Sequence, residues 1–261
     1  CIGHGERIAV KLNTPAYQIN NPVRSLYLDS QQTLWIGTKG SGIVRIPNYP
    51  ANNTPEKHDR LIAGSSTLTD NSVYCFAPGG KDRLWIGTEN GINYYSYSTR
   101  QLKELAVQAN GTKVKYVHSI DQTNDTTLWI STVGEGIVKV IIENRGTNPI
   151  VKHAARTLVS NGHMASNYFF TSYRESDSVL WFGNRGLGAY RIDVRTGETV
   201  PFLSPFFRPP LRSTGSNFIT VAIIRDSVNP YRPLCQESNR NRQCILHINK
   251  YLRINTLLIP E

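Results

Sequence analysis

The stretch Leu34-Trp35-Ile36-Gly37-Thr38 occurs, with small changes, at three further places in this 261-residue chain. The four stretches hold every tryptophan of the protein, at spacings of 50, 44 and 52 residues (35 to 85, 85 to 129 and 129 to 181). A period of this length is typical of proteins built by repeating one unit of supersecondary structure. The four repeated tryptophans are Trp35, Trp85, Trp129 and Trp181.

Each stretch is followed by a turn signal and a second apolar run. The fifth residue after each tryptophan is a glycine or, once, an asparagine, and both residue types tolerate a positive φ. Two apolar runs joined by a tight Gly or Asn turn together indicate a β-hairpin. The turn residues are Gly40, Asn90, Gly134 and Gly186.

Further strands are expected on both sides of each hairpin. In three of the units an asparagine stands 14 residues before the tryptophan and opens an apolar run, whereas the third unit has Lys115 at that place. A fourth strand follows the hairpin, for instance at 198–202. Four strands in about 45–50 residues are the content of one blade of a β-propeller. The three asparagines are Asn21, Asn71 and Asn167.

The apolar character of the tryptophan stretch predicts how a blade packs. A strand buried on one face alternates apolar with polar residues, whereas Leu34, Trp35 and Ile36 are apolar in succession, which indicates burial on both faces. Leu34 and Ile36 would then face one neighbouring blade and Trp35 the other. We therefore interpret the four tryptophans as structural residues of the repeat and not as a platform for sugars.

The predicted fold class is all-β, a β-propeller of four-stranded antiparallel blades with four full repeats and a partial blade at each end. Residues 21–203 would form the four blades, residues 1–20 the end of a preceding blade and residues 204–227 the start of a fifth. Residues 228–261 show no repeat and form, on this interpretation, a divergent or aberrant tail. We expect the chain to be a fragment of a larger propeller protein.

The composition excludes several classes of protein. Hydrophobic residues make up 39% of the chain and charged residues 18%, which is atypical of a disordered chain. No apolar run reaches the roughly 18 residues that a membrane-spanning helix needs. The net charge of +10 could attract nucleic acid or acidic glycans. Because the sequence has no RNP-like strand, basic helix or zinc-finger spacing, we predict no nucleic-acid partner.

No set of residues indicates catalysis or metal binding. The six histidines form no pair with metal-ligand spacing, and the Gly-x-Gly turns join two strands where a dinucleotide site needs a strand and a helix. Cys235, Cys244 and His247 match no common zinc module. The sequence thus predicts no catalytic residue, metal or cofactor in this segment. Three aspartates at the ends of first strands are expected to close turns: Asp29, Asp121 and Asp226.

The repeated stretch, read as Leu-Trp-Ile-Gly-Thr-x-x-x-Gly-Ile/Leu, resembles the two-component regulator propeller repeat. Thr38 and Thr88 complete the Gly-Thr step, whereas Ser131 replaces the glycine in the third unit. The resemblance covers about residues 21–203, and no fifth tryptophan follows. It implies a fragment of a seven-bladed propeller from the extracytoplasmic sensor region of a hybrid two-component system histidine kinase.

The resemblance also implies a ligand-sensing function. The expected ligand is an oligosaccharide or similar small molecule bound in the periplasm, and the expected signal passes through a homodimer of the parent chain. The membrane would be crossed only by segments outside this one. Such a ligand should meet the turns between second and third strands on one face of the propeller. Those turns contribute Lys39, Glu89, Asn90, Glu135, Asn184 and Arg185.

The sequence alone leaves two other functions open. A stand-alone propeller could be a scaffold for protein–protein interaction, and it would then bind a protein in place of a sugar. Some propellers are lyases or dehydrogenases with His, Glu or metal sites at the central channel. His118 and Tyr74 could approach such a channel near the start of first strands. A converging polar set with a metal or cofactor would favour the enzyme.

Overall fold

A computed structural model describes residues 19, 21–49, 59–157, 167–184, 188–202, 234–238 and 241–245 of the chain. Within these residues every element of regular secondary structure is a β-strand. Accordingly, this part of the chain contains no helix long and apolar enough to cross a membrane.

Four antiparallel sheets of four strands each follow one another along the sequence, and the strands of every sheet pair in sequence order. The first sheet contains β1 (Val23–Leu28), β2 (Leu34–Thr38), β3 (Ile43–Ile46) and β4 (Asp59–Leu61). The second contains β5 (Val73–Gly79), β6 (Arg83–Thr88), β7 (Gly91–Ser96) and β8 (Gln101–Leu105). The third contains β11 (Val117–Asn124), β12 (Thr127–Thr132), β13 (Ile137–Arg145) and β14 (Asn148–Thr157). The fourth contains β15 (Phe169–Arg174), β16 (Val179–Asn184), β17 (Gly188–Asp193) and β18 (Thr199–Phe202).

Two short hairpins lie outside these sheets, and the sequence analysis predicted neither. β9 (Gln108–Ala109) pairs with β10 (Thr112–Lys113) between the second and third sheets. β19 (Leu234–Ser238) pairs with β20 (Asn241–Ile245) within the segment interpreted as a divergent tail. The predicted partial blades fall on residues 1–20 and 204–227, of which the structure describes residue 19 alone.

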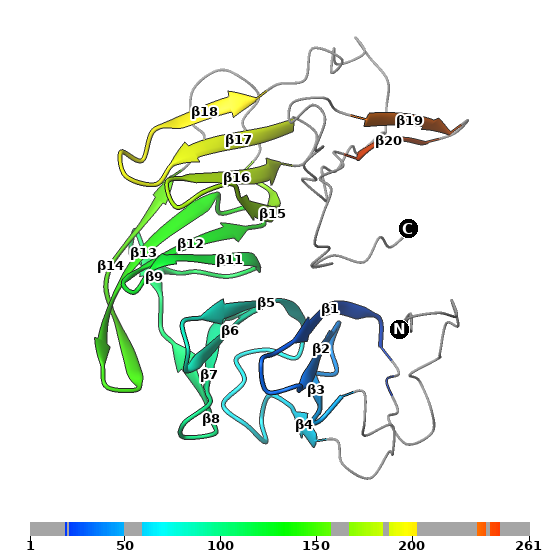
Figure 1. Cartoon of the computed structure of the whole chain (residues 1–261), viewed down its shortest axis with the longest axis vertical. Helices are drawn as coiled ribbons and strands as arrows, with labels where there is room; N and C mark the ends of the chain where they lie inside the picture. Colours follow the sequence, from blue (N-terminus) through cyan, green and yellow to red (C-terminus); the bar gives the residue numbers. More distant parts are fainter. Residues whose placement is uncertain are drawn as a thin grey trace.

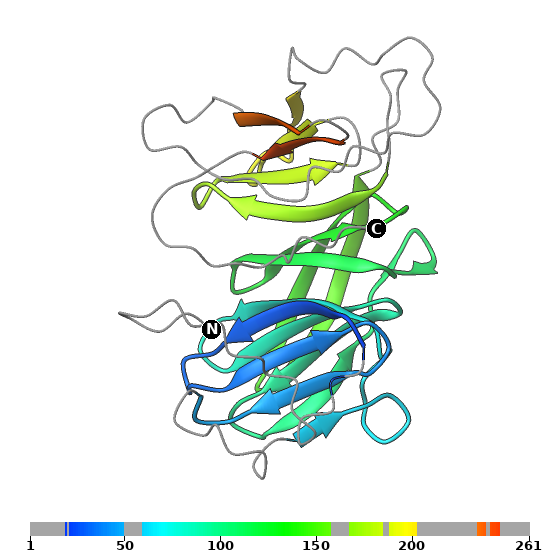
Figure 2. The same cartoon turned by 90° about the vertical axis from the view of Figure 1, so that its right-hand side faces the viewer.

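The four sheets are arranged around an arc as the blades of a propeller (Figure 1). The first strands β1, β5, β11 and β15 contact one another in turn on the concave side, and the fourth strands lie toward the outside. After a turn of 90°, the sheets are seen stacked one above the other along the arc (Figure 2). The prediction of an all-β propeller with four-stranded antiparallel blades is therefore confirmed.

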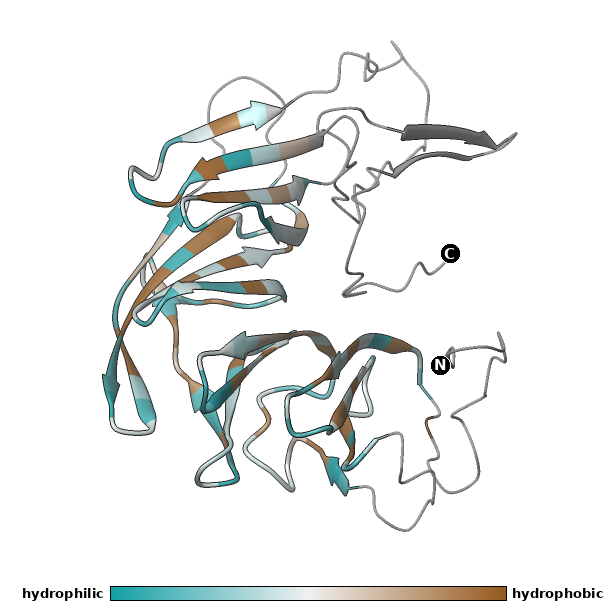
Figure 3. Cartoon of the chain, viewed as in Figure 1, coloured by the Kyte–Doolittle hydropathy of each residue, from teal (hydrophilic) through white to brown (hydrophobic). Residues whose placement is uncertain are grey.

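The second strand of a blade is buried on both faces. Leu34 and Ile36 lie in one apolar cluster with Ile46, whereas Trp35 lies in another cluster with Phe76 of the next blade. Because side chains alternate along a strand, successive residues of this apolar run meet different neighbours, as the sequence predicts. Hydrophobic residues accordingly gather in the second and third strands, and hydrophilic residues increase toward the fourth (Figure 3).

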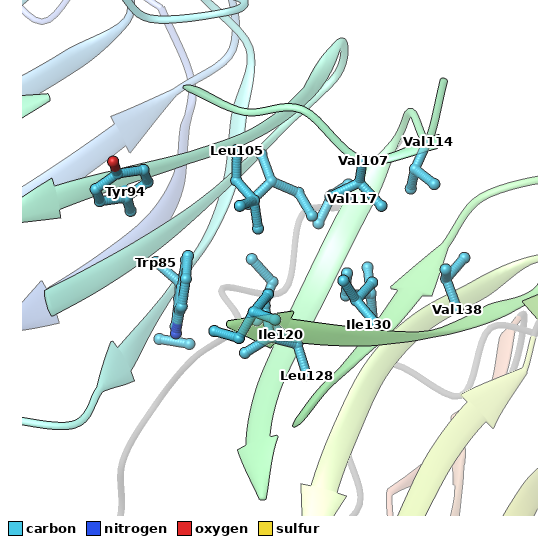
Figure 4. Close-up of a cluster of buried hydrophobic side chains, with 14 of the residues drawn as sticks. Trp85, Tyr94, Leu105, Val107, Val114, Val117, Ile120, Leu128, Ile130 and Val138 are labelled. Carbon is cyan, nitrogen blue, oxygen red and sulfur yellow. The ribbon is translucent and has the colours of Figure 1, made fainter. Parts of the chain in front are cut away.

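The contact between the second and third blades repeats this arrangement (Figure 4). Trp85 is fully buried and faces Ile120 and Leu128 of the third blade. Its indole Nε1 donates a hydrogen bond to Oε1 of Gln122 at 2.8 Å. Trp181, in the last sheet, is only partly buried. Trp35, Trp85 and Trp129 are thus residues of the inter-blade cores.

The glycine after the apolar run lies where two blades approach closely. A Cβ on Gly87 would lie 2.5 Å from Sγ of Cys75 and 2.6 Å from the carbonyl oxygen of Val117 on the next blade. The third unit has a serine at this place, and its hydroxyl lies 2.6 Å from the hydroxyl of Ser119, within hydrogen-bonding distance. The third blade therefore accommodates Ser131 through a polar contact that the glycine-containing blades do not need.

Main-chain hydrogen bonds tie the turn between second and third strands to the next blade. Gly40 N and Gly42 N both donate to the carbonyl oxygen of Asn71, at 3.0 and 2.9 Å. The φ angles of these glycines are 92° and 72°, in the left-handed region that favours glycine. We refer to this arrangement as the turn clamp. Between the third and fourth blades its members are Gly134, Gly136 and Asn167, at 3.0 and 3.1 Å.

The second blade has a shorter turn, so its contact with the third blade differs from the turn clamp. Glu89 and Asn90 alone join β6 to β7, and the left-handed position falls on Gly91, with φ 133°. Asn90, whose residue type tolerates a positive φ, does not adopt one. Across this interface Tyr116 N donates to the carbonyl oxygen of Glu89 at 2.8 Å. This main-chain hydrogen bond takes the place of the two glycine N–H donors of the turn clamp.

The aspartates expected to close turns behave differently from one another. Asp29 closes its turn, since its Oδ1 accepts hydrogen bonds from two main-chain N–H groups at 2.9 and 2.8 Å. Asp121 lies inside β11 and accepts a hydrogen bond from Ser172 Oγ of the fourth blade. Burial raises the pKa of the Asp121 carboxyl. The prediction is wrong for Asp121, because the strand continues past it, and Asp226 lies outside the described residues.

Candidate functional site

One end of the propeller brings together the beginnings of the first strands and the turns between second and third strands. Val23, which opens β1, pairs with Thr38, which ends β2. The same pairing joins the start of β5 to the end of β6 and the start of β11 to the end of β12. We refer to this end of the molecule as the turn end.

A β-bulge interrupts each first strand directly after its opening residue. In all four blades the pairing register shifts between the first and third residues of this strand, so one residue has no partner opposite. A bulge redirects the side chain of the extra residue. In every blade this residue stands 11 positions before the tryptophan (24 to 35 in the first blade). The four residues, which we name the bulge row, are Arg24, Tyr74, His118 and Phe170.

The side chains of the bulge row contact one another from blade to blade. The rings of Tyr74 and His118 are stacked, with centroids 4.2 Å apart and an interplanar angle of 16°. His118 meets Phe170 in an edge-on contact, with centroids 5.0 Å apart. The guanidinium carbon of Arg24 lies 6.0 Å from the centroid of Tyr74. A cation and three rings therefore form a continuous series across the four blades.

The surroundings fix the protonation states of this row. Burial raises the pKa of Tyr74 to about 12, and the carboxylate of Glu89, which accepts a 3.1 Å hydrogen bond from the Tyr74 hydroxyl, acts in the same direction. Burial lowers the pKa of His118 to about 4, and the positive charge of Arg24 contributes to this shift. At neutral pH the row therefore presents one cation, one phenol and one neutral imidazole.

Arg24 forms no ion pair with a carboxylate of the described residues. Among the described residues, no carboxylate lies within 4.0 Å of its guanidinium, and its buried Nε has no hydrogen-bond partner. By contrast, Arg45 pairs with Asp59 and Arg156 with Glu135. A guanidinium is a planar fork of donors that matches carboxylate and other oxyanions. Arg24 can therefore bind an anion at this end.

Two exposed tyrosines lie two residues upstream of the bulge row. Tyr116 is 41% exposed and Tyr168 is 42% exposed. Val133 connects their backbones, since Val133 N donates to the carbonyl oxygen of Tyr116 at 3.1 Å and Val133 forms an antiparallel bridge with Tyr168. Tyr116 has a φ of 51°, in a region that bulky residues rarely adopt. The turn end thus exposes two aromatic rings beside the bulge row.

Four of the six residues expected to contact ligand lie in turns at this end. Lys39 is exposed and Asn90 is half-buried. The carboxylate of Glu89 is bonded to the bulge row. The carboxylate of Glu135 accepts a hydrogen bond of 3.0 Å from the guanidinium of Arg156 and is therefore already paired. Lys39 is thus the turn residue best placed for a ligand.

The fourth blade gives less support to the expected contacts. Asn184 is fully buried at the end of β16, at the position that Thr38 occupies in the first blade, so its side chain does not face solvent. Arg185 and Gly186 lie outside the described residues.

Sequence reasoning found only part of this site. It noted Tyr74 and His118 as residues near a channel, but it missed Arg24 and Phe170 and the exposed tyrosines. The available signal was a constant distance from the repeated tryptophan, since the bulge row stands 11 positions before it (24 to 35) and the tyrosines stand 13 before it (116 to 129). These positions vary in residue type, so they do not stand out in a search for repeated letters.

The chemistry of the described residues suits recognition. They contain no group of three or more His, Cys, Asp and Glu side chains placed to hold a metal ion. Cys75 is a buried free cysteine, and burial raises the pKa of its thiol to about 12, so it is not a thiolate near neutral pH. Rings, a cation and a carboxylate at the turn end can stack on and hydrogen-bond to a bound molecule.

Stability should respond to the protonation of His118. Its pKa of about 4 in the folded chain lies below the ordinary value of 6.5, so between these values the unfolded chain binds a proton that the folded chain does not. The free energy of unfolding is therefore full above pH about 6.5 and falls as the pH drops toward 4. His118→Phe, which keeps a ring in the stack, is expected to lose less stability on acidification than the unaltered chain.

Urea denaturation of both proteins at pH about 7 and at pH about 5 measures this difference. Carboxylates titrate in both proteins and cancel in the comparison. Parallel losses of stability would show that His118 does not titrate in this way.

Comparison with known proteins places these observations in a wider context. A family model described as Two component regulator propeller matches residues 17–40 and 67–90. These segments include Trp35 and Trp85 as well as Arg24 and Tyr74 of the bulge row. The chain is 30% identical over 169 residues to Histidine kinase P4 from Formosa agariphila, a match that covers 63% of this chain and 11% of that protein.

Solved structures show the same fold. The extracellular domain of the hybrid two component system BT4673 from B. thetaiotaomicron superposes with a TM-score of 0.62 at 22% identity, covering 87% of this chain and 31% of that one. The extracellular domain of the hybrid two component system BT3049 from the same organism gives a TM-score of 0.52 at 19% identity, covering 71% and 25%. The chain therefore spans about a tenth of the curated relative and less than a third of these structures.

Proposed function

Because the chain carries two-component regulator propeller repeats, we propose that it is a ligand-sensing segment of a bacterial two-component signal transduction protein. Its sequence similarity to a histidine kinase and its structural similarity to extracellular domains of hybrid two component systems support this proposal. The segment would lie in the periplasm as part of an inner-membrane protein. Its ligand would be an oligosaccharide or a similar small molecule.

The bulge row is the observation that carries the proposal. Four blades present a side chain at the same bulge, and the four side chains differ in chemistry while contacting one another in series. A purely structural position would favour one residue type in every repeat, as the tryptophan position does. Variation at a fixed and partly exposed position is what a recognition surface requires, because each blade then contributes a different contact.

Signalling would follow from preferential binding to one arrangement of the parent protein. A ligand shifts an equilibrium between two arrangements only by the difference in its affinity for them. In the proposal those arrangements belong to a homodimer of the parent chain. The propeller contributes the binding step, and segments outside this chain contribute the kinase reaction.

Direct binding measurements test this function. The chain is titrated calorimetrically with free monosaccharides and with oligosaccharide digests of plant and algal polysaccharides, and saturable binding is expected with at least one of them. Lys39→Ala should weaken that binding, because Lys39 is an exposed residue in a turn at the turn end. Arg100→Ala, a change in the turn between β7 and β8 at the other end of the blade, is the control and should leave the affinity unchanged.

Two results would contradict the proposal. One is the absence of saturable binding to every carbohydrate tested. The other is binding that Arg100→Ala weakens as much as the change at Lys39 does, because the ligand would then not be held at the turn end.

A further inference from the structure

We infer that the ligand held at the turn end is an acidic oligosaccharide, one that carries carboxylate or sulfate groups. Tyr116 and Tyr168 would support its sugar rings, and Arg24 would bind an acidic group. This inference rests on the proposed function and specifies the chemical class of its ligand.

The first support is the position of the exposed tyrosines. In the described part of the chain, the large hydrophobic residues that are exposed and carry rings are Tyr116 and Tyr168. Both stand 13 residues before the tryptophan of their blade (116 to 129 and 168 to 181). An exposed phenol ring offers an apolar face to the C–H groups of a sugar and a hydroxyl to its oxygens. Two such rings on adjacent blades can contact successive sugars of one chain.

The backbone of Tyr116 is the second support. Its φ of 51° is one that glycine would adopt without strain, yet the chain has a large aromatic residue there. Strained backbone conformations of this kind cluster at functional sites, where the side chain contributes to function although its conformation lowers the stability of the fold. Tyr116 combines this φ with a ring that is 41% exposed, which distinguishes it from Arg100 and the three other non-glycine residues with a positive φ.

The charge of the bulge row supports an acidic ligand over a neutral one. Arg24 has no carboxylate within 4.0 Å of its guanidinium among the described residues. His118 is neutral at pH 7, because burial lowers its pKa to about 4. The carboxylate of Glu89 accepts a hydrogen bond of 3.1 Å from the hydroxyl of Tyr74, which does not cancel the charge of a carboxylate, so the acidic group of the ligand is expected at Arg24. A carboxylate or sulfate group would satisfy the guanidinium of Arg24 with paired hydrogen bonds.

The test compares acidic with neutral oligosaccharides of equal length. Tetrasaccharides from polygalacturonate, alginate and a sulfated carrageenan serve as acidic probes, and cellotetraose and xylotetraose serve as neutral ones. Calorimetric titration of the whole chain is expected to give a dissociation constant below about 1 mM for at least one acidic probe and weaker binding of both neutral probes. Binding of the acidic probe should weaken as salt is raised, because the interaction is charge-assisted.

Tyr116→Gly separates recognition from folding. The glycine relieves the left-handed strain, so the melting temperature should stay the same or rise, while the affinity for the acidic probe should fall about tenfold or more. Arg100→Gly is the matched control. Arg100 also has a positive φ, 55°, but lies at the opposite end of the second blade, so this variant should gain stability without losing affinity.

Arg24→Gln tests the acidic preference itself. The variant should lose the difference in affinity between acidic and neutral probes, while its stacked neighbours Tyr74 and His118 remain in place. If neutral probes bind as tightly as acidic ones to the unaltered chain, or if Arg24→Gln leaves the preference intact, the acidic class is overturned and the proposed sensing function stands. If no probe binds, both the inference and the proposed function are overturned.

Discussion

Replacement of Trp85 by Ala is expected to destabilise the chain by about 3–5 kcal/mol, the usual cost of deleting a buried aromatic side chain. Trp85 is fully buried between two blades, where its ring lies 5.9 Å from the ring of Tyr94 and 5.0 Å from the guanidinium of Arg83. The substitution also leaves Oε1 of Gln122 without its indole donor. Since domains are stable by only about 5–15 kcal/mol, this one change removes a large share of the total.

Equilibrium denaturation in urea measures the loss, and two variants serve as controls. Trp85→Phe keeps much of the apolar contact and should cost less than the alanine variant, so a measurable transition remains even where Trp85→Ala unfolds the chain. Trp181→Ala should also cost less, because Trp181 is only partly buried. Equal losses at positions 85 and 181 would show that burial between blades does not determine the contribution of the tryptophan.

Gly87→Ala should destabilise the chain by about 1–3 kcal/mol or more, although it adds one methyl group. The added Cβ would lie 2.5 Å from Sγ of Cys75, 2.6 Å from the carbonyl oxygen of Val117 and 2.7 Å from Cγ1 of Val117. The two groups of Val117 belong to the next blade, so the blades must separate to accept the methyl group. The expected result is a lower denaturation midpoint.

A second variant identifies the source of this effect. Cys75→Ala combined with Gly87→Ala removes the contact with sulfur but leaves the contact with the carbonyl oxygen of Val117. The double variant should therefore recover only part of the loss. Full recovery of stability in the double variant would show that the strain arises from Cys75 inside the second blade. If Gly87→Ala alone left the stability unchanged, the two blades would have to move apart at this contact without cost.

The fold could be predicted from the sequence because the apolar pattern of the tryptophan stretch indicates burial of its strand on both faces. An uninterrupted apolar run such as Leu34 to Ile36 fits a strand covered on both faces, and the clusters on the two sides of β2 confirm this. The spacing of the asparagines also marked a structural position, although the hydrogen bonds to the main-chain carbonyl of Asn71 were needed to show what that position does. The spacing and apolar pattern of the repeats therefore predicted the propeller fold without knowledge of the contacts that individual residues make.

The candidate site could not be predicted in the same way, for physical reasons. If side chains alternated strictly along a first strand, Arg24 and His118 would be assigned to the wrong face of the sheet. The β-bulge that redirects them is a shift in strand pairing, and no single residue type in the sequence marks it. The expected role of Asp121 failed for a related reason, since a buried carboxyl inside a strand depends on Ser172 of another blade. A sequence pattern within one repeat does not predict which residue of another repeat a side chain will contact.

The turn clamp has a consequence for how such chains can be lengthened or recombined. Its two halves are about 30 residues apart, glycines in one repeat and an asparagine carbonyl in the next (40 to 71), so a cut at the border between blades separates matched partners. A join placed in the loop between the first and second strands keeps each pair in one inherited segment. Gene duplication and laboratory chimeras should therefore tolerate junctions at residues 29–33 or 80–82 better than junctions at visible blade boundaries.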